Sequence, residues 1–583
     1  MKEIMMGNEA VARGAWEGGL HVATAYPGTP SSEILESLSH YPEIYSEWCT
    51  NEKVALEVAT GVSFAGGRAL VAMKHVGLNV AADPLFSLSY IGATGGIVIV
   101  TCDDPSMHSS QNEQDNRHYA ISAKIPLLEP SDSEEARIFT KLALKMSEDF
   151  DTPVLLRLTT RISHTRSVVN LGEREAVSVK GYKKDFKKRV ILPVNARKLH
   201  PKVEERTKKL KEFANNFEWN RIEEGSSKVG IVTDSISYQY VKEVFPEASV
   251  LKLSMPWPFP DKLVRRFASS VDRLLCIEEN DPFIESQIRQ LSIPVVGKDK
   301  VPMVLELNPT RVAKSFGKEF GYPVSVDIKD LPPRPPALCP GCPHTGFFYI
   351  ASKLKLIVTG DIGCYTLGAL PPLNAIDTCV EMGASIGNAY GIQLALTKLG
   401  DENLKKKVVA VIGDSTFFHS GITGLINTYY NHGFGTVVIL DNYSTAMTGH
   451  QGHPGVGKTL MGTPGRKVEL TSLIKGIGIQ NVYTVNAYDL DKIKEALKRE
   501  IERDDLSVVI IRSPCALIED FKKKPYYHVD ENKCTSCSLC LKLGCPAISM
   551  GDNYAIIDKY LCTGCSLCSQ VCPFEAIVQK EEK

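Results

Sequence analysis

Apolar and polar positions alternate in blocks along the N-terminal part of the chain. Short apolar runs bounded by turn residues occur at HVATAYPG, RALVAMKH, GIVIVTCDD and TPVLLRLTT. Such runs are typical of buried strands in a parallel sheet. Between them, SSEILESL and EEARIFTKLALKMSEDF place apolar residues at helical spacing. The pattern predicts an α/β fold built on doubly wound parallel sheets.

The same alternation returns twice further along the chain. It appears in KVGIVTDS, SVLKLSMPWPFP and DRLLCIEEN, and again in LKLIVTGDIG, KVVAVIGDS, GTVVILDN and LSVVIIRSP. A charged tract containing KKDFKKR predicts a solvated linker with one amphipathic helix, and LPPRPPALCP predicts a stiff linker. We therefore expect α/β domains at 1–180, 228–330 and 338–520, a linker at 181–227, and a small α+β domain at 525–583.

Composition narrows the class of protein. The 583 residues carry a net charge of −1, which offers no electrostatic footprint for nucleic acid or an anionic membrane. No apolar run approaches the ~18 residues of a membrane span, and the N-terminus has no signal-peptide core. We therefore expect a cytoplasmic protein. The sixteen cysteines then favour metal or redox chemistry over disulfides.

Eight of these cysteines lie in the last part of the chain. Cys534, Cys537 and Cys540 are followed by Cys545-Pro, and Cys562, Cys565 and Cys568 by Cys572-Pro. The C-x2-C-x2-C…C-P spacing is that of two-cluster ferredoxins, in which the fourth cysteine of each run binds the other cluster. Zinc would require paired knuckles at longer separation. The predicted [4Fe–4S] ligand sets are Cys534, Cys537, Cys540 and Cys572, and Cys562, Cys565, Cys568 and Cys545, although one extra residue precedes Cys545.

Two segments could bind phosphate. GHPGVGKT, Gly452 to Thr459, matches a phosphate loop by letter, but such a loop must leave a strand and open a helix. Its polar surroundings and the glycine and proline after it predict an ordinary loop.

The second segment has a better context. Gly413-Asp414-Ser415 ends one predicted strand and Asp441-Asn442 ends the next. Oxygen ligands at the carboxyl ends of adjacent strands suit Mg²⁺ holding a diphosphate. The segment resembles the thiamine diphosphate motif, which implies Mg²⁺ ligands at Asp414 and Asn442 through side chains and at Ser444 through its carbonyl. It also implies a cofactor site that includes Gly413 and Ser415.

The N-terminal domain strengthens this resemblance. AYPGTPSSEI and NEKVALEVATGVSFAGG look like the pyrimidine domain of 2-oxoacid:ferredoxin oxidoreductases. The likeness implies that Glu52 hydrogen-bonds the aminopyrimidine ring of the cofactor and activates it; a glutamate that merely stabilises a helix N-terminus is the alternative. It also implies that Thr29 faces the substrate carbonyl, although Gly28 departs from the usual residue.

The segment order and GDSTFFHSGI most resemble the large (alpha) subunit of indolepyruvate ferredoxin oxidoreductases. This resemblance implies oxidative decarboxylation of aryl 2-oxoacids with CoA, with electrons passing to ferredoxin. It also implies a smaller beta (gamma-type) subunit in an α2β2 assembly. The alternatives are an oxidoreductase for another 2-oxoacid, a non-catalytic electron-transfer subunit, and a non-oxidative decarboxylase. The second would not need both Glu52 and the Asp414/Asn442 pair, and the third would not need the cysteine-rich tail.

Four upstream cysteines form a further candidate site. Cys339 and Cys342 lie in CPGCPHTG, Cys364 in GDIGCYTLG and Cys515 in IIRSPCALI. Because cofactor sites of such sheets gather at the carboxyl ends of strands, four thiolates could converge there. In the resembled enzymes this set holds the cluster nearest the thiamine, although Pro343 replaces a frequent glycine. Four buried free cysteines are the alternative.

Overall fold

The structure is a computed structural model that describes residues 1–318, 335–518 and 525–580. It divides into two compact units, Met1–Asp327 and Ile328–Lys583, and each is considered by itself. The predicted ends of three segments (330, 520 and 583) and the start of the LPPRPPALCP linker lie outside the described residues. Within the described part of the chain, no helix has the length and apolar character needed to cross a bilayer.

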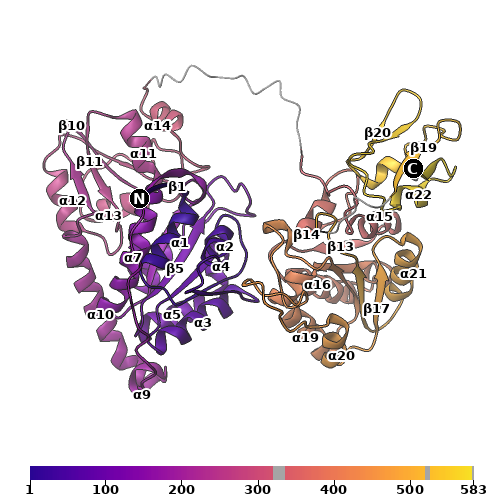
Figure 1. The fold of residues 1–583 in the computed structure, drawn as a ribbon, viewed down its shortest axis with the longest axis horizontal. Coiled ribbons are helices and arrows are strands. Elements are labelled where there is room, and N and C mark those ends of the chain that lie inside the picture. Colours follow the sequence, from indigo (N-terminus) through magenta and orange to yellow (C-terminus); the bar gives the residue numbers. More distant parts are fainter. Residues whose placement is uncertain (319–334, 519–524, 581–583) are drawn as a thin grey trace. The chain divides into compact units, whose positions relative to one another are not determined.

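The first unit contains a six-stranded parallel sheet in the order β3-β2-β4-β5-β7-β6. The four strands predicted in this region are confirmed. Alternate residues of β4, from Ala69 to Met73, pack into one apolar core with helices α3 and α5, as expected for a strand covered on both faces. Helices α1 and α7 pack against each other and α7 contacts β5 and β7 (Figure 1). The strands are β2 (Val22–Ala25), β3 (Tyr45–Trp48), β4 (Ala69–Lys74), β5 (Ile97–Asp103), β6 (Leu127–Leu128) and β7 (Val154–Thr159), and the helices α1 (Gly7–Glu17), α2 (Ser32–Leu38), α3 (Glu52–Phe64), α4 (His75–Val80), α5 (Ala82–Ile91), α6 (Arg117–Ala123), α7 (Ser133–Phe150) and α8 (Thr160–His164).

A four-stranded sheet follows in the same unit, with the order β12-β10-β11-β9 and β9 antiparallel to its neighbour. The charged tract before it contains α10, a 23-residue helix. Leu199, Val203 and Leu210 of α10 are buried, so this part of the tract is docked on the unit. The elements are α9 (Phe186–Arg189), α10 (Pro193–Asn215), β9 (Arg221–Glu223), β10 (Ser226–Asp234), α11 (Ser235–Val244), β11 (Ala248–Leu253), α12 (Asp261–Ala268), β12 (Leu274–Ile277), α13 (Phe283–Gln290) and α14 (Pro309–Ser315).

Buried ion pairs join the two sheets of the first unit. The guanidinium of Arg117, in α6, lies 2.8 Å from Asp234 at the end of β10 and 2.7 Å from Glu278 just after β12. Its Nη2 also lies 2.5 Å from Asp115. Breaking one of these pairs would leave a buried charge unpaired, at a cost of several kcal/mol. The network therefore keeps the carboxyl ends of the two sheets together. The chain ends of the first domain are also tied together, because β1 (Lys2–Met6) pairs antiparallel with β8 (Arg166–Asn170).

The second unit repeats the architecture with a parallel sheet in the order β14-β13-β15-β16-β18-β17. Helices α15 and α21 cover one face and α16, α19 and α20 the other (Figure 1). The four predicted strands are confirmed, and β14 and β17 are additional. The elements are α15 (Thr345–Leu354), β13 (Ile357–Gly360), β14 (Thr378–Cys379), α16 (Ala384–Leu399), α17 (Glu402–Lys406), β15 (Val408–Gly413), α18 (Asp414–Thr416), α19 (Ile422–Tyr430), β16 (Gly435–Asp441), α20 (Leu470–Ile477), β17 (Val482–Asn486), α21 (Leu490–Ile501) and β18 (Leu506–Arg512).

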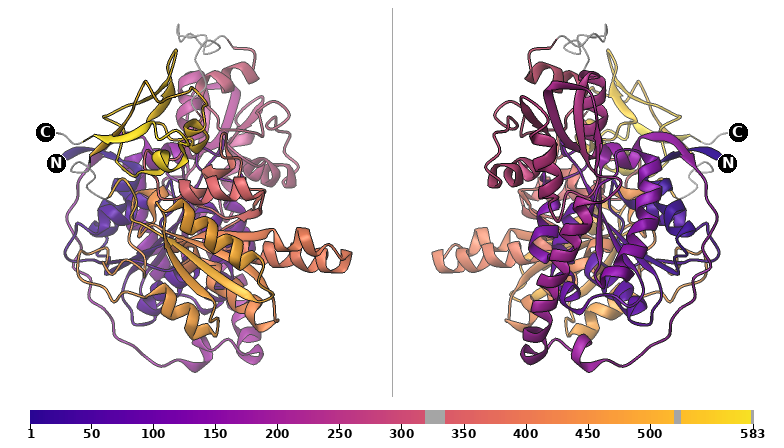
Figure 2. Two further views of the ribbon diagram at one scale, coloured as in Figure 1. Left: turned by 90° about the vertical axis from the view of Figure 1, so that its right-hand side faces the viewer. Right: turned by 90° about the vertical axis from the view of Figure 1, so that its left-hand side faces the viewer.

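The cysteine-rich tail packs on the α15/α21 side of this sheet. Leu543, Leu567 and Ile577 of the tail share one apolar core with Phe348 and Leu490 of the sheet domain, and Figure 2 shows the tail in yellow beside the orange strands and helices. Its described residues form two antiparallel strand pairs, a short α-helix and a 3-10 helix at Cys540–Leu543. They are β19 (Tyr526–Val529) with β22 (Ile577–Lys580), β20 (Ile548–Met550) with β21 (Ala555–Ile557), and α22 (Leu567–Val571).

Candidate functional site

Glu52 opens α3 at the carboxyl edge of the first sheet. Asn51 caps this helix, because its side chain accepts a hydrogen bond of 2.9 Å from the main-chain N–H of Val54. The Glu52 residue is buried and lies against Gly77 of α4, where a Cβ would sit 2.6 Å from Cγ and Oε1 of Glu52. The absence of a side chain at Gly77 therefore gives the Glu52 carboxyl its space.

Thr29 lies on the loop after β2, at the same sheet edge. Its carbonyl accepts a hydrogen bond from Ser109 Oγ at 3.3 Å, and the main-chain N–H of the preceding Gly28 donates to Ser32 Oγ at 3.0 Å.

Lys74, at the end of β4, packs against Gly28, and its Nζ donates to the Ser109 carbonyl at 2.6 Å. Burial lowers the pKa of Lys74 to about 8. Sequence reasoning missed this lysine, although a charged residue ending an apolar strand is a usable signal.

Asp414 and its neighbours form an oxygen-lined site at the carboxyl edge of the second sheet. The side-chain oxygen of Asn442 lies 2.9 Å from the Ser444 carbonyl oxygen and 3.2 Å from Asp414 Oδ1. Adjacent ligands of an octahedral Mg²⁺, each at about 2.1 Å, would be roughly 3 Å apart. Rotating the amide by 180° would replace this arrangement with two hydrogen bonds. With the Asn442 oxygen facing Asp414 and Ser444, the oxygens of these residues would suit a small divalent cation.

Charged groups surround this oxygen site. Burial and the neighbouring Asp414 carboxylate raise the pKa of Asp441 to about 6, while the Arg512 guanidinium lies 2.6 Å from Asp441 Oδ2. Burial lowers the pKa of His344 to about 4, so its ring is neutral at pH 7. The Nε2 of His453 lies 3.1 Å from Asp414 Oδ2. The carboxylates of Asp414 and Asp441 repel each other, and a cation bound between them would attract both.

The structure brings together the four upstream cysteines, which come from separate places in the sequence. Burial raises the pKa of Cys342, and the thiols of Cys364, Cys339 and Cys515 raise it further. Burial and the thiols of Cys515 and Cys339 raise the pKa of Cys364 to about 11. The main-chain N–H of Cys515 donates to the Asn442 carbonyl at 3.0 Å, which places this thiol group beside the oxygen site. Binding of iron would require loss of the thiol protons.

The eight tail cysteines fall into two groups of four. Burial raises the pKa of Cys540, and the thiols of Cys537, Cys534 and Cys572 add to the shift. Burial likewise raises the pKa of Cys565 to about 11, with Cys545 and Cys562 contributing. The two groups line separate cavities of about 360 and 450 Å³, each including space open to solvent. The groups are Cys534, Cys537, Cys540 and Cys572, and Cys545, Cys562, Cys565 and Cys568.

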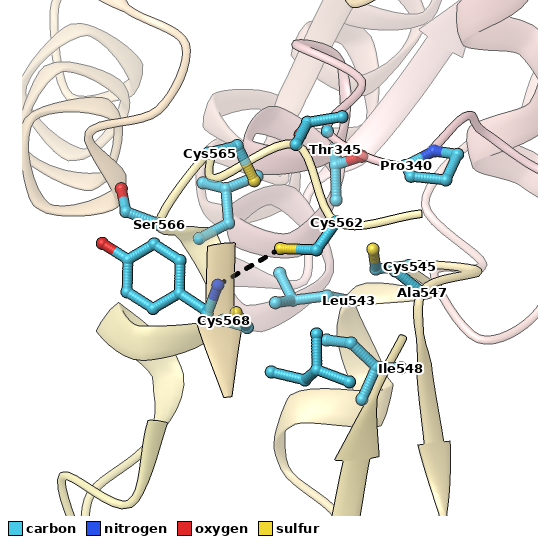
Figure 3. A pocket seen from close by; sticks show the side chains of 15 residues that line it. Pro340, Thr345, Leu543, Cys545, Ala547, Ile548, Cys562, Cys565, Ser566 and Cys568 are labelled. Carbon is cyan, nitrogen blue, oxygen red and sulfur yellow. Dashed lines mark hydrogen bonds between the residues drawn. The ribbon is translucent and has the colours of Figure 1, made fainter. Parts of the chain in front are cut away.

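The CPGC turn of the upstream group also borders the larger tail cavity. Pro340, Gly341 and Thr345 line it together with Cys562 and Cys565 (Figure 3). A Cβ at Gly341 would lie 1.9 Å from the Oγ1 of Thr563, in the C-T-G-C turn of the tail. The two turns are therefore in contact, and Gly341, with a φ of 70°, is a glycine for both conformational and steric reasons.

The loop that mimics a phosphate site has no strand directly before it and no helix directly after it. Residues 452–459 are irregular, and Lys458 forms an isolated antiparallel bridge with Pro464. The prediction of an ordinary loop is confirmed. His453 in this loop nevertheless contacts Asp414, which the sequence did not indicate.

Comparison with known proteins identifies the parts of the chain. Residues 13–217 match the family "Pyruvate flavodoxin/ferredoxin oxidoreductase, thiamine diP-bdg". Residues 361–511 match "Thiamine pyrophosphate enzyme, C-terminal TPP binding domain" and residues 555–578 match "4Fe-4S binding domain". The second match contains the oxygen site, and the third contains four of the eight tail cysteines, Cys562, Cys565, Cys568 and Cys572.

Relatives that align over nearly the whole chain belong to the same class of enzyme as the matched family models. The "Indolepyruvate oxidoreductase subunit IorA" of Archaeoglobus fulgidus is 43% identical over 615 residues, which cover 99% of this chain and 97% of that protein. Those of Thermococcus kodakarensis and Methanothermobacter thermautotrophicus are 42% and 41% identical at the same coverage. The chain therefore belongs to the indolepyruvate oxidoreductase subunit IorA family and is a thiamine diphosphate-dependent, iron–sulfur 2-oxoacid:ferredoxin oxidoreductase subunit.

Proposed function

We propose that this chain catalyses the oxidative decarboxylation of aryl 2-oxoacids, indolepyruvate among them, with CoA as co-substrate. The 2-oxoacid carboxylate and CoA give aryl-acetyl-CoA, CO₂, one proton and two electrons, and two ferredoxins each take one electron. The relatives' name supports the aryl substrate. The observation that carries the redox part is the group of four thiols whose member Cys515 is hydrogen-bonded through its main-chain N–H to the Asn442 carbonyl, since these thiols could hold an electron-accepting cluster next to the cofactor site.

The chain's own residues would bind and activate the cofactor. Asp414 and Asn442 through side chains and Ser444 through its carbonyl would hold Mg²⁺, and the Gly413–Ser415 turn would face the diphosphate. Bound thiamine diphosphate supplies a carbanion that adds to the 2-oxo carbon and accepts the electrons left by CO₂. Glu52 would hydrogen-bond the pyrimidine ring, and Thr29 would orient the substrate carbonyl.

Cys339, Cys342, Cys364 and Cys515 would hold a third [4Fe–4S] cluster, which would supply a one-electron acceptor next to the cofactor site. The contact between the Gly341 turn and Thr563 supports transfer next to the cluster on Cys545, Cys562, Cys565 and Cys568. Cys534, Cys537, Cys540 and Cys572 would hold a cluster that ferredoxin could reach, because Cys537 is exposed.

The remaining proposals concern assembly and location. We propose that a smaller beta (gamma-type) subunit completes an α2β2 enzyme, because the relatives are named as subunits. A cytoplasmic location fits the oxygen-sensitive clusters. The domain divisions predicted from the sequence remain our proposal for the functional parts: 1–180 for the pyrimidine ring, 338–520 for the diphosphate and 525–583 for the two tail clusters.

An anaerobic substrate panel tests the proposed function. The purified chain, with and without its partner subunit, is given thiamine diphosphate, Mg²⁺, CoA and ferredoxin, and reduction of ferredoxin is followed with indolepyruvate, phenylpyruvate, pyruvate and 2-oxoglutarate. We expect the aryl substrates to have the highest kcat/KM and the activity to require CoA. Preference for a non-aryl acid would indicate a related oxidoreductase, and release of aldehyde without ferredoxin reduction would indicate a non-oxidative decarboxylase.

Iron analysis tests the third cluster. Anaerobically purified wild type should hold about 12 iron atoms and 12 sulfides per chain, and the Cys342→Ser, Cys515→Ser double variant about 8 of each. Cys379→Ser is the matched control, because Cys379 lies in the same domain but outside the four thiols, and it should keep about 12. The intact chain is preferable to a truncation, because the tail shares an apolar core with α15 and α21. A wild type with about 8 iron atoms and an unchanged double variant would refute the third cluster.

A further inference from the structure

We propose that His453 is a positioning residue that orients Asp414 for Mg²⁺, an inference that rests on the proposed metal site. His453 lies in the segment GHPGVGKT, whose resemblance to a phosphate loop the fold does not support. The segment would thus act on the diphosphate indirectly, through one histidine and a carboxylate, and not through its glycines and Lys458.

The hydrogen bonds of His453 determine which ring nitrogen carries the proton. The main-chain N–H of Gly455 donates to Nδ1 at 3.1 Å, so Nδ1 must present its lone pair. The proton of the neutral ring is then on Nε2, which lies 3.1 Å from Asp414 Oδ2 and donates to it. One main-chain donor two residues away therefore sets the imidazole tautomer.

This bond leaves the other carboxylate oxygen for the metal. Asp414 Oδ1 faces the Asn442 oxygen at 3.2 Å and accepts the main-chain N–H of Ser415 at 2.9 Å. With Oδ2 held by His453, the carboxylate cannot rotate without breaking a buried hydrogen bond. Partners of this kind commonly contribute 10- to 100-fold to metal affinity.

The packing around His453 makes the arrangement rigid. Its side chain is 4% exposed and that of Asp414 is 3% exposed, and the ring lies 5.6 Å from that of Phe418, centroid to centroid. The chain just before this segment is fixed to the same strand end, since Thr445 Oγ1 donates to Ser415 Oγ at 2.7 Å and the main-chain N–H of Thr445 donates to the Gln451 carbonyl at 3.0 Å. The loop and the metal site therefore form one structural unit.

Two substitutions separate the hydrogen bond from the packing. His453→Phe keeps an aromatic ring against Phe418 but removes the donor, and His453→Gln keeps an N–H donor at similar reach. Lys458→Ala is the control, because it changes an exposed side chain of the same loop. Calorimetry of Mg²⁺ binding in the presence of thiamine diphosphate, and the spin-resonance signal of bound Mn²⁺, measure the metal site without turnover.

We expect His453→Phe to weaken Mg²⁺ affinity 10- to 100-fold, with His453→Gln within about 5-fold of wild type and Lys458→Ala unchanged. The His453→Phe enzyme should recover activity at high Mg²⁺ concentration. Equal affinity in His453→Phe and wild type, or a Gln variant as weak as the Phe variant, would overturn the proposal. If wild type itself failed to bind Mg²⁺ with thiamine diphosphate, the proposed function would fail instead.

Discussion

Glu52→Gln is expected to reduce turnover about 1,000-fold or more while leaving thiamine diphosphate bound. A carboxylate can stabilise a protonated pyrimidine nitrogen and an amide cannot, so the change removes several kcal/mol of transition-state stabilisation. Glutamine has nearly the same shape, so the contact with Gly77 should persist. The fold of α3 should persist as well, because Asn51 provides its N-cap.

Single-turnover kinetics with an aryl 2-oxoacid, together with calorimetry of cofactor binding, measure this effect. Glu57→Gln is the matched control, since Glu57 lies in the same helix and is exposed, paired with Lys53; its kcat should equal that of wild type. A Glu52→Gln enzyme with near-normal turnover would remove Glu52 from the mechanism. Loss of cofactor binding in this variant would instead assign Glu52 a binding role.

Asp414→Ala is expected to abolish productive binding of thiamine diphosphate, with a loss of at least about 100-fold in affinity. In the proposed site the diphosphate would reach the protein through Mg²⁺, and removal of the Asp414 carboxylate would leave only two of the three converging oxygens. The change also leaves the His453 N–H without its buried acceptor. Affinity should therefore fall further than in any His453 variant.

Calorimetric titration of the apo protein with thiamine diphosphate at fixed Mg²⁺ measures the loss. Asp491→Ala changes an exposed carboxylate in the same unit and should leave affinity unaltered. Iron content should be the same in both variants, because no cysteine is changed. An Asp414→Ala protein that binds the cofactor like wild type would contradict the metal assignment.

The strand pattern was largely predictable from local sequence. Runs such as GIVIVTCDD and KVVAVIGDS are almost entirely apolar because both faces of a parallel sheet are covered. The composition of such a run therefore predicts that the strand is buried. The short strands β14 and β17 and the β1–β8 pair were not predicted. VYTVN is half-exposed and has little contrast with its surroundings, and the pairing of Lys2–Met6 with residues 166–170 depends on a distant partner.

The functional residues also divide into those that the sequence identified and those that it did not. The tail cysteines and the Asp414-to-Asn442 spacing are recognisable because each set is fixed by a short stretch of chain or by two adjacent strand ends. Gly77 and His453 have no such signal, and Lys74 is marked only by its charge at the end of an apolar strand. Their roles depend on which loop lies against which strand end, and a single sequence does not contain that information.

The sequence by itself determined the α/β class and the ferredoxin-like tail, because these follow from periodicity and ligand spacing, and it indicated thiamine diphosphate through resemblance to a known motif. Only the tertiary structure decided that Cys339, Cys342, Cys364 and Cys515 meet beside Asp414, and that the Gly341 turn contacts the tail. The physical reason is that parallel strands bring their carboxyl ends to one edge of the sheet whatever their separation in sequence. Which side chains face one another there is then decided by loop packing.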